Sequence, residues 1–100
     1  MKIISWNIQG LNNPHKHDIL KNMIRDNRPD IFVIQETKML KDKVEFLSIF
    51  KGGKIIGCDF EGASGGIAVF WINRWIQGEI ISQNTNMMNI RLKISKDDFS

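Results

Sequence analysis

Polar side chains end two apolar stretches of this sequence, and their chemical types suit a metal-assisted reaction. Asn7 follows the stretch "KIISW", and Gln35-Glu36-Thr37 follows "IFVI". Carboxylate and amide oxygens suit Mg²⁺, which keeps several waters and is commonly held by one or two carboxylates plus substrate phosphates. In such a site the metal acts as a Lewis acid for a phosphoryl group, while an Asn can orient the phosphate or a water. Whether Asn7 and Glu36 act together depends on the elements that carry them.

The segment before Glu36 predicts a strand, a helix and a second strand. Lys2–Ile8 favours a strand because apolar residues dominate it and Gly10 follows. Asn13 then supplies a helix cap and Pro14 a first helical residue, and the helix should end before Pro29. Four apolar residues repeat at helical spacing within it: Ile19, Leu20, Met23 and Ile24. The run 31–34 is apolar at every position, which is typical of a strand covered on both faces in a parallel sheet.

A strand-helix-strand unit places its two strands parallel and usually adjacent, with a right-handed connection. Both strands then end at the same edge of the sheet, where α/β proteins generally bind ligands. We therefore expect Asn7 and Glu36 to lie close enough to share one hydrated cation. A second interpretation stays open, in which the two residues only end strands at a solvated edge.

After Glu36 the sequence predicts one more helix and then several strands. The stretch from Leu40 to Phe50 predicts a second amphipathic helix, which Gly52-Gly53 ends. Four short β-rich segments follow at the spacing of antiparallel strands: "KIIGCDF", "GGIAVFWI", "WIQGEIIS" and the alternating "MNIRLKI". The chain is thus predicted to be α/β, beginning with a βαβ unit and continuing as an antiparallel meander.

Composition limits the possible classes of protein. One hundred residues fit one small domain, and 42% apolar with 25% charged residues is ordinary globular usage. The net charge of +3 is compatible with a nucleic-acid partner without demonstrating one. A single cysteine, Cys58, favours a reducing compartment. We find neither a signal-peptide pattern nor an apolar run of the roughly 20 residues that span a bilayer, so we predict an intracellular protein, nuclear or cytoplasmic, without a membrane partner.

Two motifs in this order resemble the opening of the endonuclease/exonuclease/phosphatase superfamily. "KIISWNIQGL" is similar to its first motif, a strand ending in Trp-Asn, and "RPDIFVIQETK" is similar to its second, ending in Gln-Glu-Thr. Lys38 after that motif resembles the nuclease branch, meaning exonuclease III-like apurinic/apyrimidinic endonucleases and the endonuclease domains of non-LTR retrotransposons. "SGGIAVFW", at 64–71, resembles the Gly-Gly entry into a central strand of that branch.

The resemblance implies a fold and a role for each site residue. Residues 1–100 would form part of the domain, lacking its C-terminal part: the N-terminal part of a two-sheet β-sandwich flanked by helices. Glu36 would be the ligand of Mg²⁺, with Mn²⁺ possible, and Asn7 would position the phosphate or a metal-bound water. DNA would be the substrate of the full-length protein, although inositol phosphates and lipid headgroups occur in the superfamily.

The sequence also departs from the family pattern. The family has a later Tyr or His, a Gly-Asp-Phe-Asn motif and a closing Asp-His, whereas this chain has no Tyr and ends at Ser100. "CDFEG" precedes the Gly-Gly strand, so Asp59 and Glu61 are interpreted as strand-edge or loop residues. We therefore expect the chain alone to bind metal weakly and to be inactive. The alternative is a catalytically dead remnant that acts as a small interaction module, and an uncovered sheet could cause self-association.

Other polar and aromatic residues have simpler interpretations. His15 and His17 fall in the opening turn of the first helix, where solvated surface is expected. Trp71 and Trp75, near Arg74, could stack on bases, but core and edge packing is the commoner role. Three lysines after Glu36 could contact a DNA backbone or be merely solvated: Lys38, Lys41 and Lys43. Met87-Met88 is interpreted as core filling.

Overall fold

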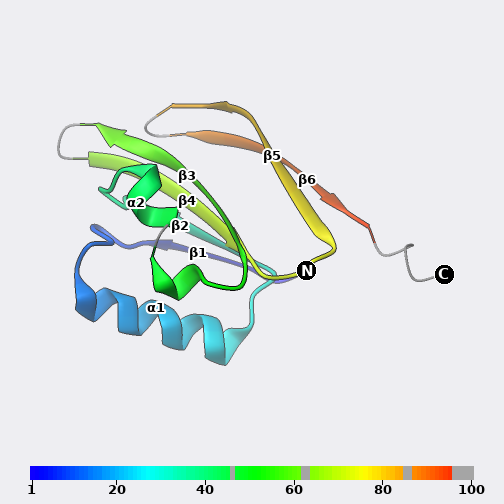
Figure 1. Ribbon diagram of the computed structural model, residues 1–100, viewed down its shortest axis with the longest axis horizontal. Helices are drawn as coiled ribbons and strands as arrows, with labels where there is room; N and C mark the ends of the chain where they lie inside the picture. The colour runs from blue at the N-terminus through cyan, green and yellow to red at the C-terminus, as the bar shows by residue number, and fades with distance from the viewer. Residues whose placement is uncertain (46, 62–63, 85–86, 96–100) are drawn as a thin grey trace.

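The computed structural model describes residues 1–45, 47–61, 64–84 and 87–95. Its elements follow in the order β1 (Ile3–Asn7), α1 (Pro14–Asn27), β2 (Ile31–Gln35), α2 (Lys41–Glu45), the 3-10 turn η1 (Ser48–Phe50), β3 (Lys54–Glu61), β4 (Ser64–Trp71), β5 (Ile76–Gln83) and β6 (Met88–Ile94). They form three layers, with the helices on one face of a four-stranded sheet and the β5-β6 hairpin on the other (Figure 1).

The predicted βαβ unit is confirmed. β1 and β2 pair in parallel, with Ile3 opposite Ile31 and Asn7 opposite Gln35. α1 connects them and begins as expected, because the Asn13 side chain accepts a hydrogen bond from the backbone N–H of His15 and Pro14 opens the helix. The helix ends at Asn27, before Pro29. Both strands therefore finish at one edge of the sheet.

The strand order of the main sheet is β1-β2-β4-β3, so β2 and β4 are its two central strands. β4 runs antiparallel to both of its neighbours. β5 and β6 form a separate two-stranded sheet, so the predicted continuous meander is wrong at the connection after Trp71. The chain crosses there to a second layer, which confirms part of a two-sheet sandwich.

Two apolar clusters, counted among the described residues, lie between the layers. One lies between the main sheet and the helices and consists of Ile8, Leu11, Leu20, Phe32, Ile34, Val44, Phe50, Ala68 and Phe70. The other lies between the main sheet and the hairpin and consists of Ile31, Val69, Trp71 and Ile76. β2 contributes alternate residues to both clusters, and this explains why its sequence is apolar at every position.

The second predicted helix is shorter than expected. The stretch from Leu40 to Phe50 contains only the five-residue α2 and the three-residue η1, and Leu40 is 47% exposed. Val44 and Phe50 are nevertheless buried under the main sheet, which satisfies the apolar pattern that suggested one amphipathic helix. In α1, Leu20 is buried but Ile19 lies at the edge of the apolar face, with 36% exposure.

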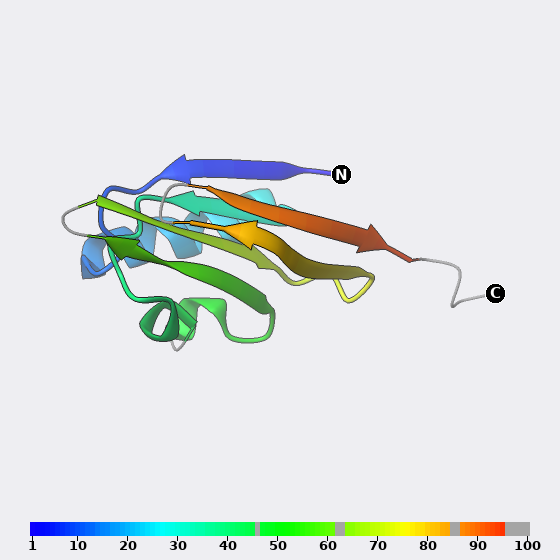
Figure 2. The same cartoon turned by 90° about the horizontal axis from the view of Figure 1, so that it is seen from above.

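Seen from above, the β5-β6 hairpin covers the middle of the main sheet but leaves β1 uncovered (Figure 2). Ile3, on β1, is 57% exposed, and Leu92, on β6, is 37% exposed. Between them runs a groove of about 380 Å³, lined mainly by apolar side chains: Ile3, Ile31, Val33, Gln35, Ile67, Val69, Met87, Met88, Ile90 and Leu92. Part of the predicted exposed apolar surface is therefore present, although the hairpin covers more of the sheet than expected.

Candidate metal centre at the ends of two parallel strands

The residues after β1 and β2 continue side by side beyond the sheet. The N–H groups of Ile8, Gly10 and Leu11 donate to the carbonyls of Gln35, Glu36 and Thr37 over 3.0, 2.8 and 2.8 Å, respectively. Asn7 pairs with Gln35, the residue immediately before Glu36. The structure thus places Asn7 and Glu36 at the ends of neighbouring strands.

A third segment completes this edge. The N–H groups of Thr37 and Lys38 donate to the carbonyls of Gly66 and Gly65, each over 3.1 Å. The N–H of Gly65 donates in return to Oε2 of Glu36, also over 3.1 Å. The start of β4 therefore holds the Glu36 carboxylate, a contact that the sequence did not predict. The Gly-Gly pair was the only indication of it in the sequence, because glycine readily adopts the positive φ that Gly65 (+92°) and Gly66 (+88°) have here.

Backbone strain concentrates at this edge. Among the described non-glycine residues, positive φ occurs at Gln9 (51°), Arg28 (46°), Glu36 (57°) and Lys38 (53°). Arg28 caps the end of α1, whereas the other three flank the strand ends. Such conformations cost about 1–3 kcal/mol each. They persist only where several surrounding contacts hold the backbone in place, as at binding sites. The network of hydrogen bonds described above provides those surroundings.

Burial differs among the polar side chains. Asn7 is exposed and Glu36 is half-buried, so both can reach a ligand from solvent. Thr37 is fully buried, and its Oγ1 has no hydrogen-bond partner among the described residues. The polar pair that could bind a cation is thus accessible, whereas the third polar residue of the motif packs inside the protein.

The donor set fits a hydrated magnesium ion with few protein ligands. Glu36 offers a carboxylate whose Oε2 accepts only the hydrogen bond from Gly65 among those described, and Asn7 offers an amide oxygen. Oxygen donors of this kind, supplemented by waters, are what Mg²⁺ takes. No group of three or more His, Cys, Asp or Glu side chains lies together in the part of the chain that the structure describes. A site made of these residues alone would therefore bind the ion weakly.

The segment after Asn7 has two partners on α1 that the sequence analysis missed. Nζ of Lys16 donates to the carbonyl oxygens of Ile8 and Gln9, over 2.6 and 2.8 Å. Nε2 of His17 lies in hydrogen-bonding contact with the carbonyl oxygen of Leu11. His17 is half-buried, so its predicted role as solvated surface is wrong, whereas His15 is exposed as expected. The sequence signalled neither the Lys16 contact nor the His17 contact, because both depend on how α1 docks.

A small basic cleft is lined mainly by residues of the segment that follows Glu36 in the chain. It has a volume of about 220 Å³ and is lined by Asn12, Lys38, Met39, Leu40 and Lys43. Lys38, Lys41 and Lys43 are all exposed, so each of these predicted DNA contacts remains accessible. Asn12 was not predicted as part of this surface, because it lies in the loop before α1 and only the fold brings it next to Lys38.

The other predicted candidates do not join the site. Trp71 is 4% exposed and its Nε1 donates to the Ile76 carbonyl over 3.0 Å, which confirms core packing. Trp75 is 38% exposed and lies in the turn before β5. Asp59 and Glu61 belong to β3, but their side chains lie outside the described part of the structure. Met88 packs between the sheets, as predicted, whereas Met87 is 57% exposed.

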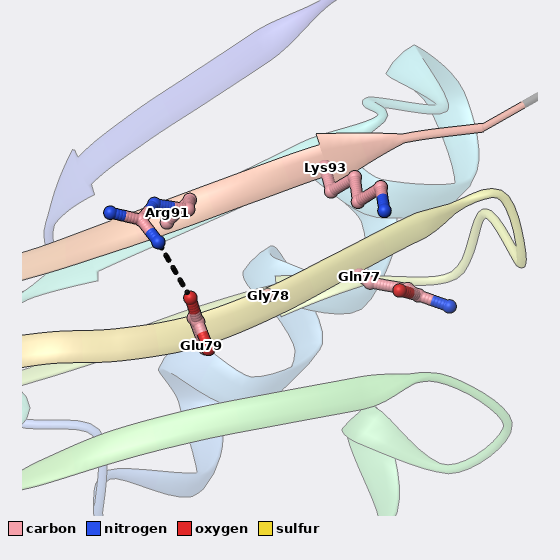
Figure 3. Close-up of a pocket in the computed structure, with 5 residues that line it drawn as sticks. All are labelled: Gln77, Gly78, Glu79, Arg91 and Lys93. Atoms are coloured by element: carbon pink, nitrogen blue, oxygen red, sulfur yellow. Dashed lines mark hydrogen bonds and ion pairs between the residues drawn. The ribbon is translucent and has the colours of Figure 1, made fainter.

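A separate hollow of about 250 Å³ lies on the outer face of the β5-β6 hairpin (Figure 3). It is lined by Gln77, Gly78, Glu79, Arg91 and Lys93. Arg91 and Glu79 form an ion pair across the two strands, over 3.2 Å, and both side chains are mostly exposed. Exposed pairs of this kind contribute little stability. The hollow belongs to the smaller sheet and not to the edge that carries Glu36.

The fold is that of the nuclease and phosphatase class, and the sequence matches its family. The model of the endonuclease/exonuclease/phosphatase family matches residues 4–75. The chain therefore belongs to this family. A comparison with curated proteins found no significant match.

Solved structures share the fold at low sequence identity. A 3' phosphatase from Neisseria, bound to a product DNA hairpin, aligns with a TM-score of 0.64 and 24% identity, covering 95% of this chain and 38% of that one. An AP endonuclease from Archaeoglobus fulgidus aligns with a TM-score of 0.61 and 21% identity, over 95% and 37%. An AP endonuclease from Leishmania major aligns with a TM-score of 0.63 and 23% identity, over 79% and 27%. The chain thus spans less than two fifths of these structures. None of the described helices is long and apolar enough to cross a membrane.

Proposed function

We propose that this chain is the metal-binding, N-terminal portion of a Mg²⁺-dependent phosphodiesterase that cleaves DNA, with Mn²⁺ able to replace Mg²⁺. The observation that carries the proposal is the position of Glu36. Its carboxylate accepts a hydrogen bond from Gly65 at the sheet edge where β1 ends in Asn7. Family membership supports the same reaction class.

Glu36 and Asn7 have different roles in this proposal. Glu36 holds the cation through its carboxylate oxygens, while the Gly65 N–H fixes the direction in which the carboxylate faces. Asn7 orients a phosphate oxygen of the substrate or a water molecule. When bound, the metal supplies Lewis-acid stabilisation of negative charge on the phosphoryl group.

The choice of DNA as substrate rests on the basic cleft that Lys38, two residues after Glu36 in the chain, helps to line. The cleft lined by Asn12, Lys38 and Lys43 offers two ammonium groups and an amide to backbone phosphates. A relative with the same fold was solved with a DNA hairpin. The proposed location is inside the cell, in the nucleus or the cytoplasm, where genomic DNA lies.

The isolated chain is proposed to be inactive, because its described residues offer no good general base beside Glu36. Both histidines lie at the start of α1, and His17 contacts the Leu11 carbonyl. Hydrolysis needs an activated nucleophile together with stabilised phosphoryl oxygens, and losing part of such a set removes most of the acceleration.

Two assays test this function. Isothermal titration with Mg²⁺ and Mn²⁺ should give affinity of about millimolar order at most, lost in Glu36→Gln. Nicking of supercoiled plasmid and of an abasic-site duplex should be absent in the chain and in Glu36→Ala. Metal binding that Glu36→Gln leaves unchanged would overturn the proposed site. Robust nicking that disappears in Glu36→Ala would instead identify an autonomous nuclease.

The apolar groove between β1 and β6 supports a second candidate function, that of a catalytically dead interaction module that self-associates. Ile3, Met87 and Leu92 line this groove and expose apolar surface. Light scattering should then report particles larger than a monomer, and Leu92→Glu should reduce their size. Ile72→Glu is the matched control, because Ile72 is 52% exposed but does not line the groove. A monomer at all concentrations would exclude this candidate.

A further inference from the structure

We propose that Lys16 is a positioning residue, which holds the segment carrying Asn7 in the place where Asn7 can act with Glu36. This inference rests on the proposed metal site. Nζ of Lys16 reaches back from the first turn of α1 and donates to the carbonyls of Ile8 and Gln9, over 2.6 and 2.8 Å. These are the two residues that directly follow Asn7.

The segment after Asn7 needs an external partner because its backbone is strained. Gln9 has φ of 51° and Gly10 has φ of 108°, so the chain leaves the extended conformation immediately after β1. A non-glycine residue in that region is energetically unfavourable unless surrounding contacts hold it. Hydrogen bonds from a charged donor are shorter and stronger than neutral ones, and Lys is a donor only, so its ammonium suits two adjacent carbonyls.

Contacts hold this segment from two directions. On the side of β2, the N–H groups of Ile8, Gly10 and Leu11 donate to backbone carbonyls of 35–37. On the side of α1, Lys16 binds the carbonyls of Ile8 and Gln9, and His17 contacts that of Leu11. Without the ammonium, the N–H contacts to β2 remain but the carbonyls of Ile8 and Gln9 lose this partner.

Glu36 has contacts besides the Gly10 N–H that donates to its carbonyl, and these do not involve the segment that Lys16 holds. Its carboxylate is fixed by Gly65, and its backbone continues into Thr37 and Lys38, which pair with Gly66 and Gly65. Removal of Lys16 should therefore disturb the Asn7 half of the site and leave the Glu36 half in place. This asymmetry distinguishes positioning from a general loss of stability, which would affect both halves.

The test is nuclear magnetic resonance of the full chain during Mg²⁺ titration. Mg²⁺ is diamagnetic and shifts mainly the signals of groups next to the ion, so the shift of the Asn7 side-chain amide at saturating Mg²⁺ is compared with that of the Gly65 backbone amide. Four proteins are measured: wild type, Lys16→Met, Lys16→Arg and Lys21→Met. Lys21→Met is the matched control, because Lys21 is an exposed lysine of α1 that the site does not involve.

Lys16→Met should lose most of the Mg²⁺-dependent shift at Asn7, whereas the shift at Gly65, extrapolated to saturating Mg²⁺, should be retained. Lys16→Arg should restore the Asn7 shift in part, and Lys21→Met should match wild type. Equal loss of the saturated shifts at Asn7 and Gly65, or an unchanged Lys16→Met, would overturn the inference. Absence of a Mg²⁺-dependent shift near Glu36 in wild type would instead refute the metal site. Circular dichroism verifies folding, and Lys16→Gln replaces Lys16→Met if the latter does not fold.

Discussion

Gly65→Ala is the substitution that separates the cost of backbone strain from the loss of metal binding. Gly65 has φ of +92°, and its N–H donates to Oε2 of Glu36 over 3.1 Å. Alanine retains the N–H but disfavours this φ, so the backbone must either accept the strain or rotate the N–H away from Glu36. We expect a loss of about 1–3 kcal/mol in the free energy of unfolding, the cost of a residue held in a sparsely populated backbone region.

Gly52 provides the matched control for this substitution. Its φ is +90°, and a Cβ added there would have no atom of the described residues within 4 Å. Gly52→Ala should therefore cost a similar free energy through backbone strain alone, because no contact opposes the added methyl group. It lies in the turn before β3 and not beside Glu36, so metal binding should be unaffected.

Urea unfolding and Mn²⁺ titration of the two variants provide the measurement. Both variants should be destabilised, but only Gly65→Ala should weaken Mn²⁺ binding, by about tenfold if the N–H acts as an outer-shell partner of the carboxylate. If Gly65→Ala binds Mn²⁺ as tightly as wild type, the Gly65 N–H does not orient Glu36. Equal weakening in Gly52→Ala would mean that global stability, and not the local contact, controls binding.

Two further substitutions test the packing. Thr37→Val should raise the free energy of unfolding by roughly 1 kcal/mol, because the buried Oγ1 has no partner in the described part of the chain and burying an unpaired hydroxyl costs about 1–3 kcal/mol. A destabilised variant in thermal unfolding would show that this hydroxyl is satisfied. Gly78→Ala should cost about 1–3 kcal/mol through overpacking, since a Cβ there would lie 2.7 Å from the Trp71 ring. An unchanged unfolding midpoint in Gly78→Ala would contradict the close packing of the hairpin on Trp71.

The sequence predicted those parts of the fold whose determinants are local. Asn13-Pro14 begins α1 because the cap and the first helical residue are adjacent in the chain. The apolar run 31–34 identified a strand covered on both faces, and the βαβ rule then placed Asn7 and Glu36 at one edge of the sheet.

The remaining features depend on contacts between distant segments. Nothing local to Trp71 indicates that the chain leaves the main sheet and that β5 pairs with β6 in a second layer. The contacts of Lys16 with Ile8 and Gln9 depend on how α1 docks, and the contact of Gly65 with Glu36 depends on β4 entering beside β2. The spacing of apolar residues between Leu40 and Phe50 predicted one helix, but two shorter elements, α2 and η1, form there instead.

Anomalous diffraction from crystals of the chain soaked in Mn²⁺ tests directly whether the ends of β1 and β2 form one cation site. We predict a manganese peak in contact with the Glu36 carboxylate, with the Asn7 side chain beside the ion or one of its waters. Crystals of Glu36→Gln, soaked in the same way, should lack that peak. A peak elsewhere in the wild-type crystals, with Asn7 and Glu36 turned away from each other, would mean that the two strand ends do not form one cation site.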